Sequence, residues 1–137
     1  MKQINKIEFK NVKNLNLSHN DDSLDIKILE KLNFPNLEIL NLSSNRISDI
    51  TILEKVNFKE LKELDLSLND IYNIDILEKV NFKELEQLYL NNNEIYDIKV
   101  LEKVKFDKLI ILNLNNNFIS DISILEKANF KDLKELF

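Results

Sequence analysis

The hydrophobic residues of this chain recur with a period of 24 positions. Leucine recurs at the same place in each period, at Leu37, Leu61, Leu85, Leu109 and Leu133. From the first four of these positions the chain reads LxxLxLxxNxI, and the x positions are mostly polar. A sustained repeat of this length predicts a solenoid of stacked coils, because one coil is too small to bury its own apolar face.

Each period contains two different hydrophobic spacings. Leu40 and Leu42 alternate with polar residues, which predicts a short strand with both leucines on one face. Ile50, Leu53 and Val56 are three residues apart, which is a helical spacing, and Asp49 directly before them can cap a helical turn. Stacked coils would therefore form a parallel sheet with strands about 4.8 Å apart. A short α or 3-10 turn on the opposite, convex side would provide each crossover.

The repeat divides the chain into coils of one domain, spanning 1–137. A partial coil is predicted first, and the beginning of a sixth repeat is predicted last. The boundaries are 1–11 for the partial coil, 12–36, 37–60, 61–84, 85–108 and 109–132 for the repeats, and 133–137 for the last segment. The first repeat has one residue more than the others, because Leu37 follows Val12 by 25 positions rather than 24.

Two further columns of identical residues are predicted to be structural. A buried Asn amide can bond the backbone where each strand ends, and buried polar groups need such partners. The Asn column consists of Asn20, Asn45, Asn69, Asn93 and Asn117. Aromatic rings at a fixed place in each coil are expected to form a stacked spine in the core. The Phe column consists of Phe9, Phe34, Phe58, Phe82, Phe106 and Phe130.

Composition argues against several classes of function. The chain has no Cys, which excludes disulfides, thiolate zinc sites and cysteine nucleophiles, and no Gly, which excludes glycine-rich phosphate loops. A net charge of −5 argues against nucleic acid as the main partner. His19 is the only histidine, and the neighbouring Asp21, Asp22 and Asp25 lack a complete calcium-loop pattern, so a solvated acidic loop is the favoured interpretation. We therefore expect no enzymatic activity, no cofactor and no metal.

The sequence shows neither a secretion signal in its first residues nor a membrane span. The first residues alternate charged and apolar groups and do not resemble a secretion signal. No apolar run is long enough to span a membrane. Together with the absence of Cys, these features favour a cytoplasmic location.

The extended motif LxxLxLxxNxIxDIxxLxxL resembles leucine-rich repeat proteins of the subclass shared by bacterial internalins and a regulatory subunit of protein phosphatase 1. Its Asp-Ile step is matched by Asp49–Ile50, Asp97–Ile98 and Asp121–Ile122, whereas Asn73–Ile74 departs from it. The resemblance implies a right-handed α/β solenoid, in the form of a horseshoe segment. Short parallel strands would line its concave face, and a rigid curved surface would bind another macromolecule.

The concave face should therefore contain the partner-binding residues. Residues between the leucines of each strand vary among repeats and point away from the core. Exposed apolar and aromatic side chains are the usual anchors of an interface. The predicted binding residues are Ile39, Asp65, Leu68, Tyr89, Ile111, Asn113 and Phe118.

Three hypotheses about function follow from these patterns. The first is a non-catalytic module that binds a protein partner through its concave face. The second is a targeting or regulatory segment of a larger enzyme or enzyme complex whose catalytic part lies outside this chain. The third is end-to-end self-association, because neither terminal coil has a recognisable polar cap.

Overall fold

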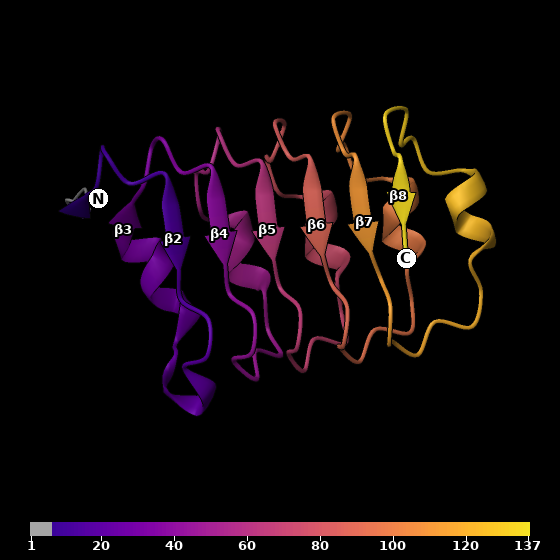
Figure 1. The fold of residues 1–137 in the computed structure, drawn as a ribbon, viewed down its shortest axis with the longest axis horizontal. Helices are drawn as coiled ribbons and strands as arrows, with labels where there is room; N and C mark the ends of the chain where they lie inside the picture. Colours follow the sequence, from indigo (N-terminus) through magenta and orange to yellow (C-terminus); the bar gives the residue numbers. More distant parts are fainter. Residues whose placement is uncertain (1–6) are drawn as a thin grey trace.

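The structure is a computed structural model that describes residues 7–137, so part of the coil predicted at 1–11 lies outside the described residues. Six parallel strands stand side by side in the order β2-β4-β5-β6-β7-β8 (Figure 1). Their bounds are β2 (Asn14–Asn16), β4 (Ile39–Asn41), β5 (Glu63–Asp65), β6 (Gln87–Tyr89), β7 (Ile111–Asn113) and β8 (Glu135–Leu136). The pairing joins equivalent residues of successive repeats, for example Leu40 with Leu64 and Leu64 with Leu88.

The convex segments are all 3-10 helices within the described residues, which resolves the predicted choice between α and 3-10. Their bounds are η1 (Asp21–Ser23), η2 (Ile26–Lys31), η3 (Thr51–Glu54), η4 (Asp75–Glu78), η5 (Lys99–Glu102) and η6 (Ser123–Glu126). Each helix has only one or two turns, and 3-10 geometry is typical of such short pieces. Neighbouring helices from η2 to η6 contact one another and form a second row.

The Asp-Ile step of the motif positions these helices. Asp49 Oδ1 accepts a hydrogen bond from Thr51 N at 2.9 Å, and the same bond runs from Lys99 N to Asp97 at 2.9 Å. Asn73 replaces the aspartate in the third repeat and makes the equivalent bond, at 2.8 Å from Asp75 N. Asn73 therefore keeps the structural role of the aspartate, because an amide oxygen accepts a hydrogen bond as a carboxylate oxygen does.

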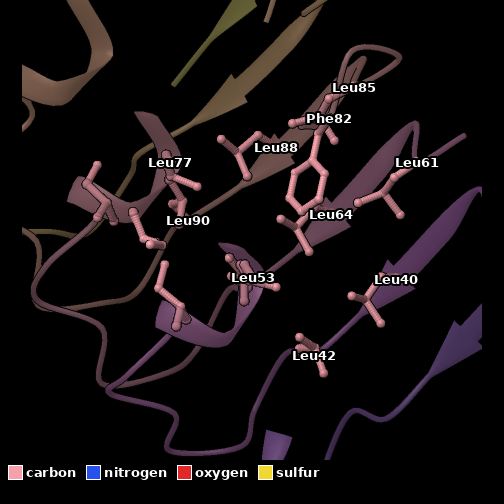
Figure 2. Close-up of a cluster of buried hydrophobic side chains, with 14 of the residues drawn as sticks. Leu40, Leu42, Leu53, Leu61, Leu64, Leu77, Phe82, Leu85, Leu88 and Leu90 are labelled. Atoms are coloured by element: carbon pink, nitrogen blue, oxygen red, sulfur yellow. The ribbon is translucent and has the colours of Figure 1, made fainter. Parts of the chain in front are cut away.

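The core lies between the sheet and the helices. The central leucine of each strand from β4 to β7 is completely buried, and Figure 2 shows Leu40, Leu64 and Leu88 in successive strands facing Leu53 and Leu77 of the helices. Full burial of one such side chain contributes about 1.5–3 kcal/mol. The leucines of successive coils are register partners in one common core, so the fold depends on stacking.

The Asn column forms a continuous ladder between coils. Asn69 Nδ2 donates to Leu42 O of the preceding coil at 3.0 Å and to Leu66 O of its own coil at 3.1 Å, while its Oδ1 accepts from Ile47 N at 2.9 Å. Asn45, Asn93 and Asn117 make the same kind of bridge, whereas Asn20 is exposed. No buried side-chain polar atom in the described residues lacks a partner. The Asn side chains thus stand in for backbone bonds where each strand ends.

The Phe column is buried in its middle and open at its ends. Phe34, Phe58, Phe82 and Phe106 are buried, Phe130 is half-buried and Phe9 is exposed. Two pairs of rings are stacked, Phe9 with Phe34 at 5.1 Å between centroids and Phe58 with Phe82 at 6.4 Å. The four buried rings belong to the same hydrophobic core as the leucines.

A second, two-stranded sheet was not predicted. In it β1 (Ile7–Glu8) pairs in parallel with β3 (Leu32–Asn33). Phe9 N continues this ladder with a bond of 2.8 Å to Asn33 O. Later coils have Val-Asn, Val-Lys or Ala-Asn at the place of Leu32–Asn33 and form no strand there. The hydrophobic pattern does not distinguish these cases.

Candidate functional site

The outward side of the six-stranded sheet is a surface on which the residues vary from repeat to repeat. Residues on either side of each central leucine are half-buried in β4 to β7, while the leucine itself is buried. We call this surface, together with the turn residue that follows each strand by three positions, the open sheet face. Its members are Asn14, Asn16, Ile39, Asn41, Glu63, Asp65, Gln87, Tyr89, Ile111, Asn113 and Glu135 in the strands, and His19, Ser44, Leu68, Asn92 and Asn116 in the turns.

Most of the Asn and Asp residues on this face have a structural task. Asp65 Oδ1 accepts from Ser67 N at 2.9 Å and from Ser67 Oγ at 2.6 Å. Asn41 bonds Ser43 in the same way, and Asn113 Oδ1 accepts from Asn115 N at 3.0 Å. These bonds turn the chain out of each strand. Two predicted binding residues, Asp65 and Asn113, therefore hold a turn with one side-chain oxygen.

Tyr89 differs from the other residues in the row that contains Asp65 and Asn113. It occupies the place of Asp65 and Asn113, its register partners on either side, but a phenol cannot make their local turn bond. Its hydroxyl instead donates to Gln87 Oε1 at 2.7 Å on the same face. Burial raises the pKa of the Tyr89 hydroxyl, and the carboxylates of Glu63, Asp65 and Glu135 raise it further. Tyr89 thus lies in a region of negative potential.

Leu68 is the one apolar residue in the row of turn residues. The turn residues of all five coils have positive φ, and the others are His19, Ser44, Asn92 and Asn116. Leu68 adopts φ 54° and is 54% exposed. A left-handed conformation costs a non-glycine residue roughly 1–2 kcal/mol, and Asn tolerates it best. The chain therefore places an apolar side chain in water at a position where a polar one would fit better.

The other predicted binding residues do not form one cluster. Ile39 and Ile111 are half-buried in one row, but Glu63 and Gln87 lie between them, so they are about 14 Å apart at the usual strand spacing. Phe118 is 70% exposed beyond the end of β7, where its N–H donates to Ile95 O at 2.8 Å. The structure brings together Asp65, Tyr89 and Asn113, with Leu68 one turn away.

The charged residues of the open sheet face near Tyr89 are all acidic. Glu63, Asp65 and Glu135 are acidic, and no Lys or Arg belongs to this face. The nearest row of lysines lies one residue before the strands, where Lys13 and Lys62 both bond Glu38, at 2.7 Å and 2.9 Å. By contrast, neither Glu63 nor Asp65 forms an ion pair with any described residue. This acidic character could have been predicted from the sequence, because Glu63 and Glu135 occupy the same position of the repeat, three repeats apart.

The helix side carries a second exposed feature that the sequence reasoning missed. Tyr72 and Tyr96 are one repeat apart and more than half exposed, and each lines a shallow groove between adjacent coils. Lys79 lines both grooves. Ser48 and Ser120 occupy the same column in other repeats, so the two tyrosines could have been found by comparing columns. They lie away from the open sheet face.

The described residues contain no cluster of three or more His, Cys, Asp or Glu side chains that could hold a metal. His19 lies in the row of turn residues and is exposed. None of the helices in residues 7–137 is long and apolar enough to cross a membrane.

The stacked strands, helical turns and Asn ladder define a repeat solenoid, and comparisons with known proteins identify its kind. Residues 36–55 match the family model for Leucine Rich Repeat. The chain is similar to the crystal structure of the internalin InlF from Listeria monocytogenes, with a TM-score of 0.73 and 29% identity over 91% of this chain. It is also similar to internalin C2 from the same organism, with a TM-score of 0.70 and 29% identity over 90% of this chain. No curated protein matches it in sequence.

The chain thus has the leucine-rich repeat fold, in the form of an internalin-like solenoid. It spans 34% of the InlF chain and 51% of the internalin C2 chain in those structures. These matches confirm the resemblance to leucine-rich repeat proteins and internalins that the Asp-Ile motif indicated. The likeness to a phosphatase regulatory subunit, the enzyme-linked role and end-to-end association stay predictions.

Proposed function

We propose that this protein is a non-catalytic module that binds a protein partner through its open sheet face, the predicted concave surface. The observation that carries the proposal is the pair Leu68 and Tyr89. Both are exposed or half-exposed, and both stand where a residue of another type would serve the fold better. Residues that break a local structural rule without a local gain are candidates for function.

The size of the face indicates how a partner would use it. Six strands about 4.8 Å apart and about three residues long present on the order of 240 Å². A standard interface takes about 800 Å² from each partner. A partner would therefore contact the turns that carry Leu68 and Phe118 as well as the strands, or would bind weakly.

Capture of partners by immobilised variants tests the proposal. The double variant Tyr89→Glu with Ile111→Glu places charge on the open sheet face, and Tyr72→Glu with Tyr96→Glu places the same charge on the helix side. We expect the unmodified chain and the helix-side variant to retain the same proteins from an extract of the source cells, and the sheet-face variant to lose them. Circular dichroism would verify that both variants fold. Loss of binding only in the helix-side variant would contradict the proposal and direct attention to the grooves beside Tyr72 and Tyr96.

A further inference from the structure

The chemistry of the open sheet face around Tyr89 indicates what kind of group it takes. Asp65 and Tyr89 are register partners on adjacent strands, and Glu63 pairs with Gln87, which accepts the Tyr89 hydroxyl hydrogen bond. One ring face and two carboxylates are thus presented together on two neighbouring strands. Glu135, two strands further along in the row of Gln87, adds to the negative potential.

These carboxylates lack a basic partner on the face itself. The ion pairs among the described residues lie elsewhere, for example between Glu38 and Lys62 before the strands and between Glu84 and Lys108. Asp65 uses Oδ1 for its turn, and no described residue bonds its Oδ2. A cation arriving from outside would find an aromatic ring and unpaired carboxylates within one strand spacing, the combination that favours Arg or Lys.

Leu68 adds an apolar contact beside this group. It follows Asp65 by three residues, and its N–H donates to Asn91 O at 3.0 Å, so its backbone lies beside the end of the strand that carries Tyr89. An extended partner segment along β5 and β6 would pass Tyr89 and reach Leu68 about three residues later, because a strand rises about 3.3 Å per residue. An apolar partner residue near a basic one would match both features.

We infer that the centre of the open sheet face binds a partner segment containing an Arg or Lys, which lies against the Tyr89 ring beside Glu63 and Asp65, with an apolar residue against Leu68. The inference rests on the proposed function and names the chemistry of its partner. The interaction has two parts: the carboxylates attract the cation, and the ring and Leu68 provide the contacts that make it specific.

Selection from a displayed library of random linear dodecapeptides tests this directly. The unmodified chain is expected to enrich peptides that contain Arg or Lys close to Leu, Ile or Phe. Synthetic versions of these peptides should bind about tenfold more weakly to Tyr89→Asn, and also to Leu68→Asn. Each substitution introduces the residue type of its own row, so the fold should be retained. Glu63→Gln with Asp65→Asn should weaken binding and reduce its dependence on salt.

Two comparisons make the outcomes distinct. Tyr96→Ser, which places on the helix side the residue found at Ser48 and Ser120, should bind the peptides as the unmodified chain does. Replacement of the peptide's Arg by Gln should remove most of the affinity. Tyr89→Asn keeps every charge of the protein, so general attraction of cations to an acidic chain would leave its binding unchanged and would overturn the inference.

Failure of this inference differs from failure of the proposed function. Selected peptides that lack basic residues but still depend on Tyr89 would overturn the inference and leave the sheet face as the binding surface. Peptides indifferent to every sheet-face variant, or no enrichment over the Tyr89→Asn chain, would contradict the inference, and binding that depends on Tyr72 and Tyr96 instead would contradict both.

Discussion

The inner and outer sides of one coil follow different rules, although they alternate along the same short strand. Inward from the sheet, Leu64, Leu88 and their equivalents are fully buried, and the residue type hardly changes from coil to coil. Outward, the adjacent row contains Asp65 and then Tyr89. The difference arises because an inner side chain must fit between two neighbouring coils, whereas an outer one needs only to leave its strand and turn intact. Substitutions inside should therefore cost stability, and those outside should change binding.

The largest loss of stability is expected from Leu88→Ala. Leu88 lies in the middle of the row of completely buried leucines, so the cavity would be closed on all sides. Removing a buried leucine side chain in such a place costs about 3–5 kcal/mol. Urea denaturation, monitored by circular dichroism, measures this loss as a lower urea concentration at the unfolding midpoint. Leu136→Ala is the control: Leu136 is 48% exposed and should cost less than about 1 kcal/mol. Equal losses at the two positions would contradict the dependence on stacking.

Asn93→Ala is expected to cost about 2 kcal/mol. The amide of Asn93 donates to Leu66 O at 2.9 Å and to Leu90 O at 3.0 Å, and its oxygen accepts from Ile71 N at 3.0 Å. Removal leaves these buried backbone groups without their partner, and an unsatisfied buried group costs about 1–3 kcal/mol.

The matched control for this polar position is Asn20→Ala. The Asn20 side chain is exposed and bonds only its own coil, through Leu17 O and Ser18 O, so water can replace these bonds. The bond from Asn20 N to Asn45 Oδ1 at 2.7 Å comes from the backbone and is kept in the variant. Its loss should be less than half that of Asn93→Ala in the same urea experiment. A comparable loss at both positions would mean that the ladder between coils adds nothing beyond a local turn.

Leu68→Asn should increase stability by about 1 kcal/mol, because Asn tolerates the left-handed conformation that Leu68 is forced to adopt. The reciprocal variant Asn92→Leu introduces the same mismatch one coil further along and should decrease stability by a similar amount. The melting temperatures of both variants, relative to that of the unmodified chain, measure these two changes in stability. If Leu68→Asn lost stability, Leu68 would have a packing role in the fold and would not be an outer residue retained for binding.

The inner side could be predicted far better than the outer side. The 24-residue period and the LxxLxLxxN spacing were enough to predict the parallel sheet and its leucine rows, since only one register buries every leucine. The same columns pointed to Tyr89 and Leu68 as candidates. The turn bonds of Asp65 and Asn113 were not predicted, because an Asn on a surface looks the same whether it binds a partner or holds a turn. The pairing of β1 with β3 was missed for a similar reason: Leu32–Asn33 and Val56–Asn57 have the same hydrophobic pattern.

The smallest effect is expected from Glu38→Gln, an outer substitution that acts between coils through charge. Hydrogen bonds from Lys13 and Lys62, and then their positive charges, lower the pKa of Glu38 from 4.5 to about 2. A carboxyl group whose pKa is depressed by folding stabilises the protein above its unfolded pKa, and this contribution is lost as the pH falls from 4.5 towards 2. The difference in melting temperature between the unmodified chain and Glu38→Gln should therefore be greatest near neutral pH and be largely lost by pH 2. Glu54→Gln, at an exposed position that forms no ion pair with any residue in 7–137, should show no such trend. A difference for Glu38→Gln that persists at pH 2 would mean that its side chain acts through packing, and the outer side would then share the constraint of the inner one.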